Sequence, residues 1–223
     1  MANKVEAVRF ALTVPVVMGH PNLIEPKAFK RNGQSKGDPK YGAIFCIDPN
    51  GPDFAGLKEA MAKAAKAFNP NADLKALKFP MTSGEKAVEK YRAKKQREGK
   101  SDDGKADFQL GKHIVKASSK YQPQLAVLDG GKAIDITPDN IGLHKNKFYF
   151  GVQAVAEFNF VGYEGQDGNP DGVTAYLNSV LSLNRGERLT GGSAAETFKG
   201  VIGNFTSEDP TGGAGFSDDV IPF

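Results

Sequence analysis

The sequence has 223 residues, 39% of them hydrophobic and 25% charged, which is enough for one well-packed domain with appendages. No apolar run reaches the roughly 18 residues of a membrane span, and residues 1–10 lack the apolar centre of a signal peptide, so we expect a cytoplasmic protein. The single cysteine, Cys46, excludes an internal disulfide and a multi-cysteine metal site. Because it lies in an apolar run, we expect Cys46 to be a core residue and not a nucleophile.

The charge is unevenly distributed along the chain. The net charge is +3, but after Lys199 there is no basic residue and there are four acidic ones: Glu208, Asp209, Asp218 and Asp219. Residues 1–199 therefore carry 29 basic against 22 acidic side chains. A basic body with an acidic tail favours a polyanion-binding surface and an anionic segment that can compete for it. A soluble protein with a solvated tail would show the same charges.

The first third of the chain contains two strand patterns and one amphipathic helix. Apolar and polar residues alternate over 5–17, which predicts a long half-buried strand with Arg9 on its polar face. A loop rich in proline, glycine and lysine is expected from Gly19 to Pro39, and a second strand over 40–48. An apolar stripe at helical spacing, including Leu57 and Met61, predicts a helix over 52–68 that packs on the core.

A second helix is expected at about 84–98. Thr82 and Glu85 have the spacing of a capping box, and Val88 and Tyr91 form a thin apolar stripe, so most of this helix should be exposed. The two helices would form an insertion at about residues 52–100.

Strand patterns return over 106–119, 124–129, 147–163 and 172–187. About five long strands, with helices inserted after the second, favour a mainly β fold with inserted helices, specifically a five-stranded OB-type barrel, over a parallel α/β sheet. We expect residues 1–203 to form this domain and residues 204–223 to form a flexible, disordered acidic tail.

Motifs that would indicate an enzyme are out of context. Gly33–Gly37 matches G-x-S-x-G but lacks the strand before it and the helix after it that a nucleophile elbow needs. Residues 167–172 begin like an EF-hand loop, but Asn178 stands at the twelfth position in place of glutamate. The three histidines lack metal-ligand spacing. We therefore expect no catalysis, no metal and no cofactor, with a nucleic-acid enzyme assembled from distant residues as an alternative.

Basic and aromatic residues occur together in three clusters, a mixture that single-stranded nucleic-acid binding uses because cations follow the phosphates while rings stack on bases. The candidate DNA-binding residues are Lys27, Phe29, Lys30, Arg31, Lys36, Lys40 and Tyr41 in the first cluster, Lys112, His113, Lys116, Lys120 and Tyr121 in the second, Lys145, Lys147 and Tyr149 in the third, and Arg9 and Tyr176 on strand faces. Strand alternation puts both Tyr149 and Tyr176 on polar faces. For any single residue, solubilisation or half-burial is the alternative.

The last residues combine charge with apolar side chains. Two aspartates precede an apolar end, and the final residue is an aromatic that carries the α-carboxylate. A partner pocket can take the ring while a basic rim takes the carboxylates. The candidate partner-binding residues are Asp218, Asp219, Val220, Ile221, Pro222 and Phe223.

These last six residues resemble the D-D-x-I-P-F tip of bacterial single-stranded DNA-binding proteins. Residues 41–45 (Tyr-Gly-Ala-Ile-Phe), 172–178 (Gly-Val-Thr-Ala-Tyr-Leu-Asn) and 184–192 (Asn-Arg-Gly-Glu-Arg-Leu-Thr-Gly-Gly) resemble bacteriophage single-stranded DNA-binding proteins with a decorated OB fold. The resemblance implies protection of single strands during phage DNA replication, recombination or repair in the host cytoplasm, and recruitment of replication enzymes through the tip. A strand-annealing or recombination mediator with duplex affinity, and an adaptor that acts mainly through its tip, are the alternatives.

Overall fold

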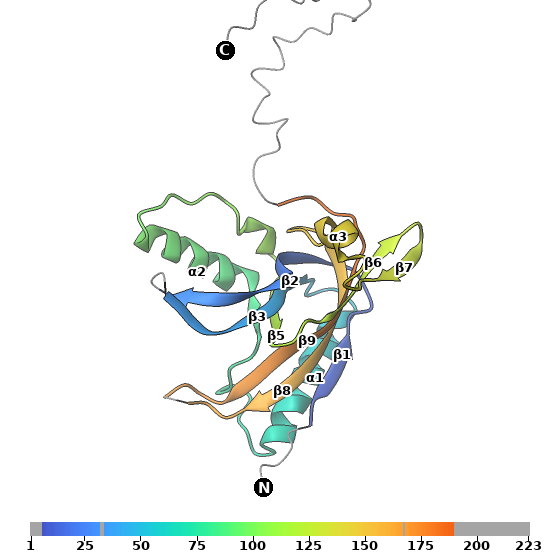
Figure 1. Cartoon of the computed structure of the whole chain (residues 1–223). Helices are drawn as coiled ribbons and strands as arrows, with labels where there is room; N and C mark the ends of the chain where they lie inside the picture. The colour runs from blue at the N-terminus through green and yellow to red at the C-terminus, as the bar shows by residue number, and fades with distance from the viewer. Residues whose placement is uncertain (1–5, 32–33, 167, 190–223) are drawn as a thin grey trace, which may run out of the picture. The chain divides into compact units, whose positions relative to one another are not determined.

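The computed structural model describes residues 6–31, 34–166 and 168–189 (Figure 1). The chain is mainly β with a few helices, as the sequence predicts. The helices are α1 (Asp53–Phe68), α2 (Gly84–Arg97) and α3 (Ile141–His144), with short 3-10 turns η1 (Asp107–Gln109) and η2 (Lys145–Lys147). The strands are β1 (Val8–Ala11), β2 (Val16–Arg31), β3 (Gln34–Ile47), β4 (Met81–Ser83), β5 (His113–Ser119), β6 (Gln124–Asp129), β7 (Lys132–Asp135), β8 (Gln153–Tyr163) and β9 (Gly172–Ser182).

A five-stranded barrel is not confirmed. The described part of the chain has nine strands in one sheet, in the order β4-β5-β3-β2-β8-β9-β6-β7, with β1 paired to β8, and this ladder does not return to its first strand. The pairs are antiparallel except β6 with β9. The count differs from the prediction because short strands such as β4 and β7 span too few residues for an alternating pattern to identify them.

The predicted first strand over 5–17 is two strands. β1 ends at Ala11 and β2 begins at Val16, and both pair with β8. The carboxylate of Asp53, at the start of α1, accepts hydrogen bonds from the Thr13 N–H (2.9 Å), the Thr13 hydroxyl (2.6 Å) and the Val14 N–H (3.2 Å). The backbone N–H groups between β1 and β2 thus donate to a side chain and not to a neighbouring strand. The alternation of apolar residues in the sequence gives no sign of this break between the two strands.

The predicted loop from Gly19 to Pro39 is wrong, because this segment belongs to the long β2–β3 hairpin. Its register shifts three times, between Gly19 and Asn22, between Asn22 and Lys27, and between Lys27 and Phe29. Bulges bend a strand and interrupt its pairing, and Lys27 and Lys40 face each other as exposed residues near the middle of the hairpin. Residues 25–27 and 37–40 are exposed, so this part of the hairpin has no buried face to produce the alternating pattern of a half-buried strand.

The core lies between one face of the sheet and α1, as predicted. Leu57, Met61 and Ala64 of α1 are buried against the sheet, and the ring of Phe158 packs edge-on against that of Phe45, with centroids 5.2 Å apart. The hydrophobic burial of these side chains fixes α1 across the sheet.

Helix α2 also forms where the sequence predicts it, but its cap differs. Ser83 and not Thr82 is the N-cap residue, and its hydroxyl accepts a hydrogen bond from the Lys86 N–H. Val88 is buried, whereas most of the helix is exposed.

Cys46 is buried, which confirms the prediction that it is a core residue. Burial raises the pKa of its thiol to about 12. No helix in the described ranges is long and apolar enough to cross a membrane.

Candidate nucleic-acid interface

Two long hairpins, β2–β3 and β8–β9, project to the same side of the described domain (Figure 1). A groove of about 370 Å³ lies beside β9, between that strand and the segment that leads into β4. We call it the β5–β9 groove. It is lined by Lys78, Phe79, Pro80, Lys116, Tyr163, Val173, Thr174 and Tyr176.

The segment 78–80 holds the two sides of the groove together through backbone hydrogen bonds. The Lys116 N–H of β5 donates to the Pro80 carbonyl (3.0 Å), and the Val173 N–H of β9 donates to the Lys78 carbonyl (2.8 Å). Both sides of the groove are therefore fixed by main-chain contacts, and side chains project from a rigid frame.

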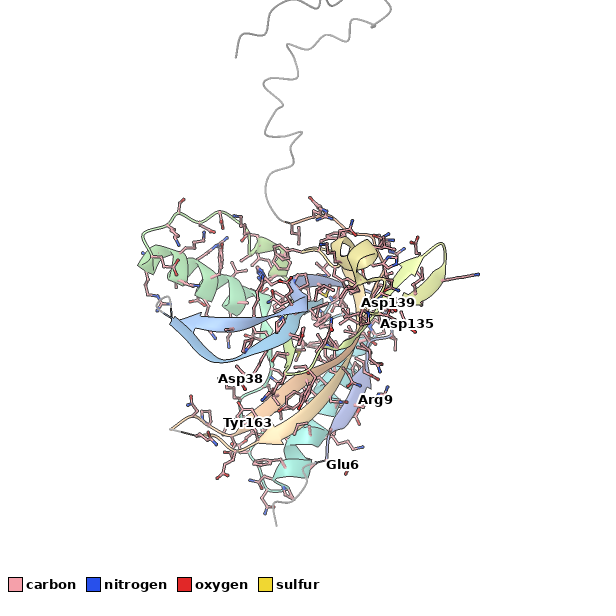
Figure 2. The ribbon with its side chains drawn as sticks, viewed as in Figure 1. Glu6, Arg9, Asp38, Asp135, Asp139 and Tyr163 are labelled. Atoms are coloured by element: carbon pink, nitrogen blue, oxygen red, sulfur yellow. The ribbon has the colours of Figure 1, made fainter. Side chains whose placement is uncertain are left out.

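The β5–β9 groove brings together two residues that the sequence analysis proposed separately. Lys116 is exposed on β5, and Tyr176 is 46% exposed on β9. The groove adds Tyr163 and Lys78, which the site prediction missed. Figure 2 shows Tyr163 on β8 near the end of the β8–β9 hairpin. Its place on the polar face of the predicted strand was a usable signal, whereas nothing in the sequence around Lys78 marks it.

Arg9 and Tyr176 lie on the same face of the sheet. Both pair with Asn159 of β8, from opposite sides, so the three residues form one row across β1, β8 and β9. The guanidinium of Arg9 forms an ion pair with the Glu157 carboxylate, which also accepts a hydrogen bond from the Asn178 side-chain amide (2.7 Å). These contacts, the one with Arg9 first, lower the pKa of Glu157. The Arg9 charge is therefore partly neutralised by Glu157.

The first predicted cluster follows the β2–β3 hairpin. Lys27 lies opposite Lys40, and the backbone of Phe29 lies opposite that of Lys36. Lys30 and Arg31 are the last two residues of β2, and the side chains of residues 29–36 are outside the described part. Tyr41 is half-buried opposite Ser119. The sequence cluster is thus a spatial cluster at the level of the backbone.

The second predicted cluster is divided between the two ends of β5. At the start, the Lys112 ammonium binds the Asp48 carboxylate (2.8 Å), and the His113 ring packs on Phe54 with centroids 4.7 Å apart. At the other end, Lys120 binds Asp38 (3.2 Å). Figure 2 places Asp38 on the β2–β3 hairpin.

After that end of β5, Tyr121 is 78% exposed. Lys116, Lys120 and Tyr121 therefore lie toward the hairpin, and Lys112 and His113 do not.

The third cluster lies on η2 and the turn after it. Figure 1 shows α3, which leads into η2, beside the β6–β7 hairpin and away from the tips of β2–β3 and β8–β9. Lys145 is exposed, whereas the Lys147 ammonium binds Asp129 (2.8 Å). This cluster is separate from the β5–β9 groove.

The prediction that Tyr149 lies on the polar face of a strand is wrong, because β8 begins at Gln153. The Tyr149 hydroxyl donates to the Gly186 carbonyl (2.9 Å), and the Arg188 guanidinium lies 4.3 Å from the centre of its ring. Phe148 and Phe150, on either side of Tyr149 in the sequence, are both buried, so this segment has the same alternating pattern as a strand. Gly151, with φ of +101°, interrupts the extended backbone before the strand begins.

Residues 11–209 match the profile of a family described as Enterobacter phage Enc34, ssDNA-binding protein. The chain belongs to this family. The resemblance seen in the sequence is therefore confirmed, and so is the prediction that the chain is not an enzyme. A search among curated proteins finds no match.

Three solved structures share the fold. The single-stranded DNA-binding protein of bacteriophage Enc34 with a C-terminal truncation is 16% identical, with a TM-score of 0.56 over 83% of this chain and 89% of that one. A further structure described as that protein is 15% identical, with a TM-score of 0.53 over 89% and 91%. Its complex with single-stranded DNA is 14% identical, with a TM-score of 0.51 over 83% and 90%.

Proposed function

We propose that this chain binds single-stranded DNA without strong sequence preference and that the β5–β9 groove is the centre of the interface. The observation that carries this proposal is the meeting of exposed Tyr176 with two lysines, Lys116 and Lys78, along one groove. A ring that stacks on any base, flanked by cations that bind phosphates, gives affinity without reading the base edges. The family and the Enc34 complex with single-stranded DNA support the same ligand.

The path of the strand would run from the groove toward the β2–β3 hairpin. Lys120 and Tyr121 follow β5 on that side, and Lys27 and Lys40 are exposed on the hairpin. Arg9 would approach from the other side, along the row that it shares with Tyr176. These side chains supply cations and rings along a surface that is longer than the groove itself.

An OB-type architecture remains part of the proposal. Strands β5, β3, β2, β8 and β9 are consecutive in the sheet, and segment 78–83 touches both outer members of this set. Met81 pairs with Val115 of β5, and Lys78 forms an isolated parallel bridge with Gly172 of β9. A five-stranded barrel closed through this segment would be a partly open OB fold with additional strands.

We further propose that the protein protects single strands during phage DNA replication, recombination or repair. Residues 1–203 would form the DNA-binding domain, and residues 204–223 a flexible tail that recruits partner proteins through Asp218–Phe223. The tail lies outside the described residues, so its role rests on the acidic and apolar sequence of the tip.

A titration of a fluorescent oligothymidylate at several salt concentrations, with unlabelled duplex as competitor, tests the binding proposal. The logarithm of affinity should fall with the logarithm of salt, with a slope of about −0.7 for each phosphate neutralised. Lys116→Gln should weaken binding and reduce the slope by about 0.7, because one phosphate contact is lost. Lys132→Gln is the matched control, since Lys132 is exposed on β7.

Three results would contradict the proposal. Salt-independent affinity would remove the role of phosphate contacts. Equal loss of binding in Lys116→Gln and Lys132→Gln would show that the groove is not the centre of the interface. Competition by duplex as effective as competition by single strands would favour the strand-annealing alternative.

A further inference from the structure

His20 has a backbone conformation that is uncommon for residues other than glycine. Among the described residues other than glycine, two have positive φ, His20 at 47° and Asn184 at 52°. Positive φ is uncommon for residues with a Cβ atom, although asparagine and histidine adopt it more often than most. His20 also lies at the first bulge of β2, between Gly19 and Asn22. Bulges redirect side chains and are frequent next to binding sites, so the direction of the His20 side chain is a candidate functional feature.

The His20 ring is stacked on a fixed aromatic support. Its centroid is 4.5 Å from that of Phe150, with an angle of 22° between the rings. Phe150 is 7% exposed and is held edge-on by Phe108, with centroids 5.0 Å apart. His20 itself is exposed. An aromatic ring that is supported on one side and open to solvent can stack on a further flat group.

The positive charges of two lysines act on this ring. The pKa of His20 is lowered by its packing and by the positive charges of Lys116 and Lys27. This shift favours the neutral imidazole, which can stack as an uncharged ring. Neither lysine forms an ion pair with an acidic residue of the described ranges, so both charges are available to phosphates.

The register of the sheet connects His20 with the β5–β9 groove. Gly19 pairs with Ile44, and Ile44 pairs with Lys116, so the residue before His20 starts a row across β2, β3 and β5 that ends at a lysine of the groove. Residues paired in this way lie on the same face of the sheet, and the Phe108 ring lies on that face too, because a Cβ atom on Gly19 would be 3.2 Å from it. Phe108 contacts Phe150, which supports the His20 ring, so these contacts link the ring to the face of the sheet that carries Lys116 of the groove.

We propose that His20 is a base-stacking residue, and that His20 on its Phe150 support, with Lys27 and Lys116 binding the flanking phosphates, forms a nucleotide subsite that extends the β5–β9 groove onto β2. This inference rests on the proposed function, because the ligand is the same single strand. The chemistry requires a flat base and a phosphate on either side of it, and it does not select among bases.

Replacing the ring while retaining the backbone conformation tests the subsite. His20→Asn and His20→Gly remove the ring and its contact with Phe150 but tolerate positive φ, so the protein should remain folded with a Tm close to that of the unchanged protein. Their affinity for an oligothymidylate should fall about 5- to 150-fold, the loss expected for one stacked base. His20→Phe retains a ring and should bind within a few-fold of the unchanged protein. Asn184→Gly is the matched control at the other positive φ, and it should leave affinity unchanged.

The outcomes separate this subsite from the proposed function. If His20→Asn binds as tightly as the unchanged protein while Lys116→Gln is weakened, the groove binds DNA and His20 does not stack. If His20→Phe is weakened as much as His20→Asn while both keep a normal Tm, a stacking role is also refuted. If the unchanged protein fails to bind oligothymidylate, the proposed function itself fails. An upfield NMR shift of the His20 ring protons on addition of oligonucleotide, lost in His20→Asn, gives independent support.

Discussion

Tyr176 and Tyr149 have the same side chain but different surroundings. Tyr176 is 46% exposed on a strand and lines the β5–β9 groove, whereas Tyr149 is half-buried in a turn, with its hydroxyl bound to the Gly186 carbonyl and Arg188 over its ring. The ring of Tyr176 is therefore accessible to a base, whereas the side chain of Tyr149 connects two segments of the chain. The same residue type therefore supports two different predictions.

Tyr176→Ala should weaken binding of single-stranded DNA by about 1–3 kcal/mol, the value of one base stack, with little change in Tm. Tyr149→Ala should lower the Tm, because it removes a half-buried ring and its hydrogen bond. Fluorescence titration and thermal unfolding of both variants check this pair. A large loss of Tm in Tyr176→Ala, with normal affinity in the folded fraction, would place Tyr176 among structural residues.

Glu157 gives the stability of the fold a dependence on pH. Its pKa is lowered by the ion pair with Arg9 and by hydrogen bonds from Asn178 and Ser179. A carboxylate whose pKa is lower in the folded state stabilises that state above its unfolded pKa of about 4.3, and this stabilisation is lost as the pH falls through the folded pKa.

Glu157→Gln should therefore reduce the free energy of unfolding at pH 7 by about 1–3 kcal/mol, because charged hydrogen bonds are lost. The difference from the unchanged protein should shrink between pH 4 and lower values, where both side chains are uncharged. Urea unfolding across this pH range measures it, with exposed Glu59→Gln as the control. A difference that is constant with pH would exclude the ionised carboxylate as the cause.

At the scale of elements, sequence patterns succeeded where one face of an element is buried. Helix α1 buries residues three and four positions apart, and most of β8 and β9 buries every second residue. These periods of burial are therefore visible in the sequence. The β2–β3 hairpin escaped prediction because it is bulged and its middle is exposed, and β4 because it is only three residues long. The groove depends on these same elements, so Lys116 and Tyr176 could be proposed singly but not as neighbours.

The attachment of α2 depends on a glycine for which the sequence gives no packing signal. A Cβ atom on Gly84 would lie 1.7 Å from the Gln109 carbonyl oxygen, and the Gly84 N–H donates to the Lys112 carbonyl (2.7 Å). The first turn of α2 is therefore in backbone contact with η1 and with the residue before β5. Only a residue without a side chain fits this approach.

Gly84→Ala should destabilise the protein by about 1–3 kcal/mol, because the backbone around η1 must shift to admit a methyl group. Gly142→Ala in α3 is the matched control, since no atom lies within 4 Å of the corresponding Cβ position. It should be neutral or stabilising by up to about 1 kcal/mol through helix propensity. Chemical denaturation of both variants measures the two changes, and equal stability would mean that α2 does not depend on this contact.

At the scale of the whole molecule, the charge of the chain is divided between a basic body and an acidic end. The four acids after Lys199 are Glu208, Asp209, Asp218 and Asp219, and they lie outside the described residues. If residues 204–223 behave as a flexible chain, their r.m.s. reach is about 25 Å, which gives the acids access to a groove on the same domain. Their local concentration would be on the order of millimolar.

Deletion of residues 204–223 should therefore tighten DNA binding modestly, and mainly at low salt, because four carboxylates offer fewer charges than an oligonucleotide and are screened as salt rises. Recruitment of a partner depends on other atoms, chiefly the Phe223 ring, so deleting Phe223 alone should leave DNA affinity nearly unchanged while it abolishes partner binding. The comparison uses the full chain, the Phe223 deletion and the tail deletion, each titrated with oligothymidylate and with a bacterial protein that binds D-D-x-I-P-F tips. Normal partner binding by the Phe223 deletion would show that recruitment does not use the tip. If the tail deletion leaves DNA affinity unchanged at every salt concentration, the acidic segment does not compete for the groove.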